Sequence, residues 1–485
     1  MTTPGDELPA RGQEVGMIPQ EGTFGMRNFG AIDWGDRRRT QRLVAAVDDL
    51  CRHPGGTLPD KLSAPSDLRA FYRLMNRPEA THAVILGSHA DYTRQCIAAL
   101  GPDAVVLILH DATELDYTTK ETLCPYLGQI GEGTHRGYIC HNSLAVRADT
   151  GAVLGLTSQL LHHRANVPKK ETDQQKRLRE NRASRLWVQG AQASGAAPAG
   201  VRCVDVSDSL SDTFEYLAYE MTHGRSFVLR AREDRRLAQP AAGQNYLDAA
   251  VESLPSQHQR ELRVQKSSGR RARLTKVQVA WTEVLLAPPG KQLGEYEKIP
   301  LAVWAVRVWE ANTPADEEPL EWLLLTNVPV ESASDADERI DWYERRPIIE
   351  ELHKGMKTGC AIETLKFEKI ERQEPAIAVL SVVSTTLLNL RDAARAPESD
   401  KRPATEVVDA EYVEVLVHHY GNRPGARPTI LKFYMHVARL GGHQNRKGDG
   451  FPGWLTLWRG WMKLQAMVDG YRAARRKTRQ GCGIN

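Results

Sequence analysis

The sequence predicts an α/β protein: a mixed sheet core with an antiparallel β insertion, flanked by helical domains at both ends. Three observations support this fold class. Ala104–Leu109 is an unbroken apolar run, as expected of a central strand buried on both faces. Three stretches between residues 275 and 328 alternate apolar and other side chains, which is typical of antiparallel strands. Residues 24–100 and the segment after residue 405 instead show helical spacing of their apolar positions.

Composition limits the possible classes of protein. A chain of 485 residues can hold roughly two to four domains. With 64 basic and 61 acidic residues, any contact with nucleic acid must come from local patches. Seven cysteines without a Cys-x2-Cys pair fit a reducing cytoplasm and argue against a disulfide or zinc framework. Residues 1–22 are polar and rich in Gly and Pro, and we expect a disordered N-terminus without a signal core.

The first helical segment carries a cluster of arginines. After Trp34, the chain opens a helix whose first turns contain Arg37, Arg38, Arg39 and Arg42. Such a cluster either binds phosphate or forms a solvated face, and the sequence alone favours neither. Two further helical stretches, near Ser66–Asn76 and Ala80–Ala99, complete a compact module.

A series of strands follows. Ala104–Leu109 ends in His110-Asp111, and a carboxylate at the end of a central strand is held rigidly, as a metal ligand needs to be. Strands at 136–147 and 152–161 form a hairpin around the turn at residues 148–151. A long polar helix, roughly 173–193, then leads to the strand at 201–206, just beyond which stands Asp208. This order of elements is that of the RNase H fold.

The next region reads as a β insertion. The strand Ser226–Arg230 precedes the alternating stretches at 275–286, 299–310 and 320–328. A basic run from Arg263 to Lys276 lies on the predicted hairpin. Within the last stretch, Trp322 is either a core residue or an aromatic platform for a base.

The helix around Glu350 is the most informative stretch. At about 100° per residue, a helix here would bring five polar side chains onto one face: Tyr343, Arg346, Glu350, Lys354 and Lys357. This face is either a solvated charged surface or an active-site surface on which Glu350 holds a divalent cation and the cations grip a phosphate. Proline usually starts or kinks a helix. If the helix starts at Pro347, Tyr343 and Arg346 lie in its approach, and only Glu350, Lys354 and Lys357 share the straight face.

The C-terminal part contains a core helix, a linker and an aromatic stripe. Residues 376–391 complete the core; the apolar part of this run is broken by Ser and Thr and too short for a membrane span. Residues 395–405 are a linker by composition. Trp454, Trp458 and Trp461 lie at helical spacing and form either an intradomain core or a dimer contact. The basic tail 472–479 either touches DNA or stays solvated.

Tyr343-x2-Arg346-x3-Glu350-x6-Lys357, with Lys354 also matching, resembles the signature of one group of bacterial insertion-sequence transposases, the RNase H-like DDE enzymes of the transposon-five type. The resemblance implies a helical DNA-binding domain at 23–95, an RNase H-like catalytic domain at 96–394 with a β insertion at about 231–335, and a helical dimerisation domain at 406–485.

The same resemblance implies the site. Asp111, Asp208 and Glu350 would be the catalytic metal ligands for two Mg²⁺ ions, with Mn²⁺ as an alternative. The implied DNA contacts are Arg230, Trp322, Tyr343, Arg346, Lys354 and Lys357. We also expect the arginine cluster, Arg37, Arg38, Arg39 and Arg42, to bind DNA. The sequence departs from the family at Pro347, and at Ser209-Leu210, where the family has Arg-Glu after the second Asp.

The implied function is cut-and-paste DNA transposition, in which the enzyme cleaves each transposon end through a hairpin and joins the ends to target DNA. The expected partners are double-stranded DNA, both terminal inverted repeats and target, and a second copy of the chain when two ends are bound. We expect a cytoplasmic, nucleoid-associated bacterial protein with no membrane partner. The alternatives are an RNase H-like nuclease that never joins and a catalytically silent DNA-binding derivative. The two Glu-x-x-His pairs, at Glu220 and Glu350, also fit a di-iron helix bundle, which the strand runs contradict.

Overall fold

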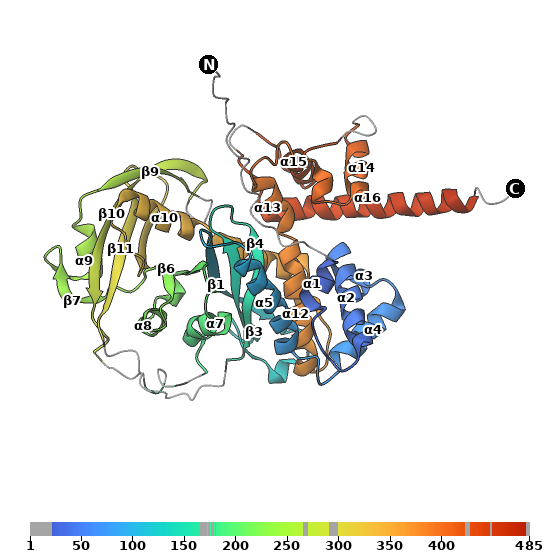
Figure 1. The fold of residues 1–485 in the computed structure, drawn as a ribbon, viewed down its shortest axis with the longest axis horizontal. Coiled ribbons are helices and arrows are strands. Elements are labelled where there is room, and N and C mark those ends of the chain that lie inside the picture. The colour runs from blue at the N-terminus through green and yellow to red at the C-terminus, as the bar shows by residue number, and fades with distance from the viewer. Residues whose placement is uncertain are drawn as a thin grey trace, which may run out of the picture.

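The computed structural model describes residues 22–164, 181–264, 270–290, 299–421, 427–446 and 449–481, together with residues 172, 175 and 179. The expected disordered N-terminus lies outside these residues apart from Gly22. The predicted fold class is confirmed: helices at the N-terminus precede a large mixed sheet with parallel strands, and helices follow it (Figure 1).

The N-terminal module is helical, as predicted. Its helices are α1 (Phe24–Phe29), α2 (Arg37–Arg52), α3 (Leu58–Lys61), α4 (Pro65–Met75) and α5 (His82–Ala98). Side-chain caps start several of them: for example, Asp36 accepts a hydrogen bond from Arg38 N at α2, and Thr81 accepts one from Val84 N at α5. Helix α5 packs on the core sheet, where His89 Nε2 accepts a 2.9 Å hydrogen bond from Leu156 N.

The core sheet contains both parallel and antiparallel pairs. Its strands are β1 (Val105–Asp116), β2 (Gly128–Gln129), β3 (Arg136–Arg147), β4 (Val153–His162), β5 (Arg202–Ser207) and β6 (Ser226–Arg230). The predicted hairpin is β3–β4, and β1 pairs antiparallel with β3. On its other side β1 pairs parallel with β5, which in turn pairs parallel with β6.

The β insertion extends this sheet instead of forming a sheet of its own. Its elements are β7 (Arg236–Ala241), β8 (Gln244–Tyr246), α9 (Leu247–Glu252), β9 (His258–Val264), β10 (Arg273–Leu286), β11 (Leu301–Glu310) and β12 (Glu321–Thr326). Strand β12 pairs antiparallel with β6, so the described strands form one continuous twelve-stranded sheet. Acids neutralise part of the basic run: Arg273 pairs with Glu310 at 2.6 Å, and Arg270 lies 3.8 Å from Glu318.

The remaining core helices are α7 (Leu186–Ser194), α8 (Phe214–Thr222), α10 (Ala333–Glu344), α11 (Pro347–Lys354), α12 (Ile370–Thr386) and α13 (Asn389–Arg395). The helix expected at 173–193 is shorter among the described residues, because a 3₁₀ turn at 183–185 precedes α7; most of residues 173–180 lie outside them. Ile370–Arg395 is long and apolar enough to cross a membrane, but 67% of its most apolar window is buried inside the fold, as in a core helix.

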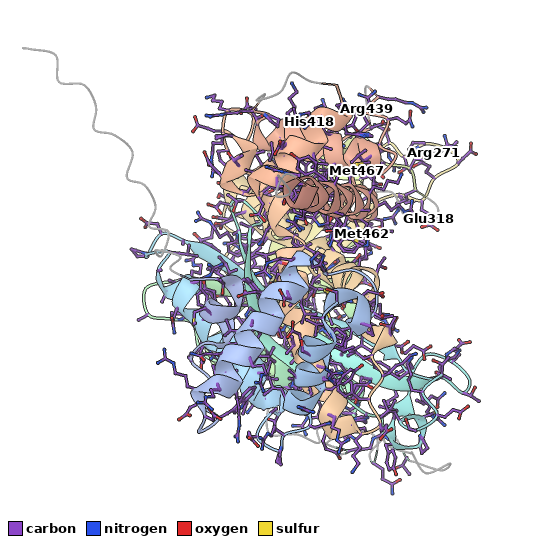
Figure 2. The ribbon with its side chains drawn as sticks, turned by 90° about the vertical axis from the view of Figure 1, so that its right-hand side faces the viewer. Arg271, Glu318, His418, Arg439, Met462 and Met467 are labelled. Atoms are coloured by element: carbon purple, nitrogen blue, oxygen red, sulfur yellow. The ribbon has the colours of Figure 1, made fainter. Side chains whose placement is uncertain are left out.

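The C-terminal domain contains α14 (Ala410–His419), α15 (Ile430–Leu440) and α16 (Trp454–Gly481). The segment interpreted as a linker is packed into this domain: Ser399 is buried and its carbonyl accepts from Leu431 N, and Ala404 N donates to Pro428 O. Composition marks where regular structure stops, but it does not reveal these backbone contacts. In Figure 2, Met462 lies on the side of α16 that faces the N-terminal helices, whereas His418 and Arg439 lie on the far side.

The tryptophan stripe packs within the chain. Trp454 and Trp458 stack with ring centroids 5.6 Å apart, and both belong to the hydrophobic cluster shared by the N-terminal module and α12. Trp461 stacks on Tyr412 at 5.1 Å. The interpretation of this stripe as a dimer contact is therefore wrong for Trp454 and Trp458, because helical spacing identifies an apolar face but not the surface that covers it. Truncation before Glu406 would remove part of that cluster.

Candidate active site

The register of two strands brings the first two candidate acids together. In the parallel pairing of β1 with β5, the last partners are His110 and Ser207. Asp111 and Asp208 are the next residues on each strand, so they lie side by side at one edge of the parallel pair. The prediction that Asp111 ends its strand is wrong, because β1 continues to Asp116 in its pairing with β3. Asp111 stands instead where the parallel ladder ends.

A local turn holds Asp208 at this edge. Its side chain accepts a 3.0 Å hydrogen bond from Leu210 N and thereby caps the 3₁₀ turn Ser209–Ser211. The Ser209-Leu210 pair, where the family motif has Arg-Glu, thus supplies the backbone donor that orients the carboxylate.

Glu350 reaches the same place from α11. That helix begins at Pro347, as predicted, and Arg346 precedes it as the N-cap residue. The Arg346 guanidinium lies 2.5 Å from Glu350 Oε1 and 3.8 Å from Asp111 Oδ2. One arginine therefore bridges the acid on the helix and the acid on the strand.

Burial is the main reason why the pKa values of the two aspartates are raised, and neighbouring carboxylates add to it. Burial and the charge of Asp208 raise the pKa of Asp111 to about 7, against the opposing effect of Arg346. Burial also raises the pKa of Asp208, and the charge of Glu350 adds to that increase. A bound cation would relieve this repulsion, which is common where carboxylates share a functional site.

The donor set suits a hard divalent cation, because three carboxylates supply the oxygen ligands that Mg²⁺ prefers. Among the described residues, however, no group of three or more His, Cys, Asp or Glu side chains is arranged so that it could hold a metal ion. The Arg346 guanidinium contacts both Asp111 and Glu350. Asp111, Asp208 and Glu350 could hold an ion once Arg346 is drawn away.

An aromatic and cationic group borders the acids. Trp322 on β12 is half-buried, and the Tyr343 ring at the end of α10 contacts it edge-on, with centroids 5.2 Å apart. Burial raises the pKa of the Tyr343 phenol, which the charges of Arg346 and Arg230 oppose. Arg230, at the end of β6, donates a 3.1 Å hydrogen bond to Glu321 O and also lowers the pKa of Asp208 by its charge.

The two lysines of the signature do not share the straight helical face first expected. Lys354 ends α11 and is exposed. The chain then passes into a π-helical turn, Gly355–Gly359, which changes the rotation per residue. Lys357 consequently lies 3.7 Å from Glu363.

The arginines of the α2 cluster differ in their contacts: one is paired within the fold and three are exposed. Arg39 lies 2.6 Å from Glu79 and also donates to Trp34 O, so it links α2 to the turn after α4. Arg37, Arg38 and Arg42 are exposed and free to face a polyanion.

Sequence reasoning missed His353 and Asn142. His353 Nδ1 lies 3.9 Å from Asp111 Oδ2, and its Nε2 lies 3.1 Å from Asn142 Nδ2. Burial lowers the pKa of His353 to about 3, with Lys357 as the next cause, so the ring is neutral. The three-residue spacing of Glu350 and His353 indicates that both side chains lie near each other on one helix, but the sequence suggests only a di-iron motif for this pair.

Comparison with protein families identifies the N-terminal module. Residues 23–80 match the family model described as Transposase DNA-binding. The match spans α1 to α4 and ends just before α5. The chain therefore carries a transposase DNA-binding domain, and its exposed arginines on α2 belong to that domain.

Proposed function

We propose that this chain, which carries a transposase DNA-binding domain, is a cut-and-paste DNA transposase that cleaves and joins DNA by metal-dependent phosphodiester chemistry. The observation that carries the proposal is the convergence of Asp111, Asp208 and Glu350 at the end of a parallel strand pair, where burial and the neighbouring carboxylates raise the pKa of Asp111. The DNA-binding domain makes a DNA phosphate the natural substrate.

The three carboxylates would hold two Mg²⁺ or Mn²⁺ ions. Bound there, such ions lower the pKa of an attacking hydroxyl and neutralise charge on the attacking and leaving oxygens. In the first step the oxygen of water bonds to phosphorus, and the bond from phosphorus to the 3′ oxygen breaks. The transposon strand then ends in a 3′-OH, and the flanking strand keeps the phosphate.

The neighbouring cations would position the DNA strand. Arg346 is placed to exchange its contact with Glu350 for a substrate phosphate, which would also free the space between the acids. Lys354, Lys357 and Arg230 would contact the adjacent phosphates. The buried phenol of Tyr343 lies beside Arg346.

Trp322 would receive a base flipped from the transposon end when the 3′-OH attacks the opposite strand to form a hairpin. The Trp322 ring is half-buried and contacts Tyr343 edge-on, so part of the ring is exposed and a base could stack on it. We expect Trp322→Ala to impair hairpin formation much more than the first nick, as followed on end-labelled DNA in denaturing gels. An equal loss of both steps together with a lower Tm would instead assign Trp322 to the core.

The central test compares cleavage with binding. Asp111→Ala, Asp208→Ala and Glu350→Ala should each abolish nicking of transposon-end DNA while leaving the gel shift intact. Asp91→Ala, which removes an exposed acid on α5, is the matched control and should change neither. Near-normal cleavage by any of the three variants would remove that residue from the site.

The products separate the alternatives. Joining of the freed ends to a target plasmid distinguishes a transposase from a nuclease that only cuts. A wild-type protein that shifts the DNA but never nicks it in Mg²⁺ or Mn²⁺ would be a silent DNA-binding derivative. A two-end complex with two copies of the chain, sized by light scattering, tests the proposed dimer.

A further inference from the structure

A row of buried polar side chains runs from the candidate site into the core. Asp111 on β1, Asn142 on β3 and Gln159 on β4 are direct cross-strand neighbours, so they form one row on one face of the sheet. Asn142 and Gln159 are both buried. His353 on α11 and His82, the first residue of α5, contact this row from the helices above it.

Hydrogen bonds connect the side chains from His82 to His353, and the bond between Gln159 and Asn142 fixes their direction. His82 Nε2 lies 3.0 Å from Gln159 Oε1, and Gln159 Nε2 donates to Asn142 Oδ1 at 2.8 Å. Because Asn142 accepts through its oxygen, its amide nitrogen faces His353 Nε2, at 3.1 Å. An amide N–H needs an acceptor, so His353 Nε2 carries no proton and the proton of the neutral ring is on Nδ1.

That proton faces the candidate metal ligand. His353 Nδ1 lies 3.9 Å from Asp111 Oδ2. The other neighbours of Asn142 Nδ2 are the sulfur atoms of Cys140 and Met356, which are weak acceptors and leave the amide committed to His353. With His82 donating through Nε2, the donors point the same way along the row, and the hydrogen bonds from His82 to His353 strengthen one another.

We propose that His353 is a positioning residue for Asp111, and that Asn142 and Gln159 fix the tautomer of His353 so that it presents an N–H to that carboxylate. This inference rests on the proposed function, because it assigns a second layer to the same site. Groups in this layer hold a ligating carboxylate in one orientation and typically account for tenfold to 100-fold in metal affinity or activity. The row also ends at His82, two residues after the DNA-binding domain match.

Two substitutions of His353 separate positioning from packing. The amide nitrogen of asparagine can take the place of Nδ1, so His353→Asn keeps a donor toward Asp111 but loses the contact with Asn142. Glutamine reaches the place of Nε2, so His353→Gln keeps an acceptor for Asn142 but offers no donor to Asp111. A purely structural role favours glutamine, because it fills more of the buried space and satisfies Asn142.

We expect the opposite order. His353→Gln should weaken Mn²⁺ binding, measured from the free-ion EPR signal, by about tenfold and should slow nicking similarly. His353→Asn should stay within roughly threefold of wild type in both measurements, even though its Tm is the lower of the two. Asn142→Asp presents an oxygen to His353 Nε2, moves the ring proton to that nitrogen, and should resemble His353→Gln.

The two readouts distinguish the failures. If wild type binds Mn²⁺ but never nicks DNA, the proposed function fails while the order of the variants in Mn²⁺ affinity still tests the positioning role. If His353→Gln binds Mn²⁺ at least as well as His353→Asn, the positioning role is overturned whatever the nicking rates. If wild type does not bind Mn²⁺, there is no ligand for His353 to position and both proposals fall.

Discussion

Two groups of acids on opposite faces of the same strand pair differ in how their charge is balanced. On one face, Asp205 of β5 accepts hydrogen bonds from Arg225 at 2.9 and 3.0 Å and from His110 at 2.6 Å. Glu220 lies 3.3 Å from the same arginine, and burial raises its pKa well above the usual range. This group, the closed cluster, is neutralised from within.

On the other face, Asp111, Asp208 and Glu350 form the open cluster. Arg346 lies between two of these acids, and Glu350 is 42% exposed at its side chain. Burial and then the charge of Asp208 raise the pKa of Asp111 to about 7, although Arg346 opposes the rise. The two clusters therefore differ in access. Breaking the ion pairs of the closed cluster destabilises the fold, whereas the open cluster has a partly exposed acid that a cation can reach.

Removing Arg225 should have the largest effect on stability. Arg225→Met leaves Asp205 buried without its main partner, so we expect a loss of about 3–5 kcal/mol in the free energy of unfolding, measured by urea denaturation. Arg230→Met, at the end of β6 next to the open cluster, is the matched control and should cost less than about 1 kcal/mol. Equal losses in the two variants would erase the distinction between the clusters.

Divalent cations should stabilise the protein through the open cluster alone. At 100 times the dissociation constant, Mg²⁺ or Mn²⁺ should add about 2.7 kcal/mol to the free energy of unfolding of wild type. Asp111→Asn should lose this increment, and Glu220→Gln should keep it. A Tm that rises equally in both variants would place the cation elsewhere.

The pH dependence of stability gives a third contrast. Between the ordinary pKa of 3.8 and the folded-state pKa of about 7, Asp111 keeps its proton in the folded protein and releases it on unfolding. Stability from this group is therefore complete below pH 3.8 and falls as pH rises to about 7, with a slope of up to about 1.4 kcal/mol per pH unit. Urea titrations from pH 4 to 8 should show a shallower decline in Asp111→Asn. A decline that is unchanged in the variant would mean that Asp111 ionises normally.

The smallest effects on stability should come from two glutamine substitutions. Glu220→Gln replaces a buried acid whose pKa is raised with an uncharged amide of similar shape. Glu350→Gln replaces a half-exposed side chain. Both should change the free energy of unfolding by less than about 1 kcal/mol. Only Glu350→Gln should abolish nicking. Loss of nicking in Glu220→Gln at normal stability would extend the active site to the closed cluster.

The sequence by itself determined the local features of this protein. The apolar run at 104–109, the alternation of the insertion strands and the helix start at Pro347 all depend on residues close together in the chain, so periodicity and backbone preference identify them. The signature around Glu350 is also local, and it pointed to transposases, as the family match of the N-terminal domain does independently.

Only the tertiary structure decided which distant segments of the chain contact each other. The register of β1 with β5 aligns Asp111 with Asp208, and 211 residues separate Asn142 from His353. The insertion shares the core sheet because β12 pairs with β6, and Trp454 turns inward because the N-terminal module covers it. Periodicity tells which face of an element is buried, but each of these contacts joins distant segments. Their pairing follows from the packing of the whole chain, which no local pattern encodes.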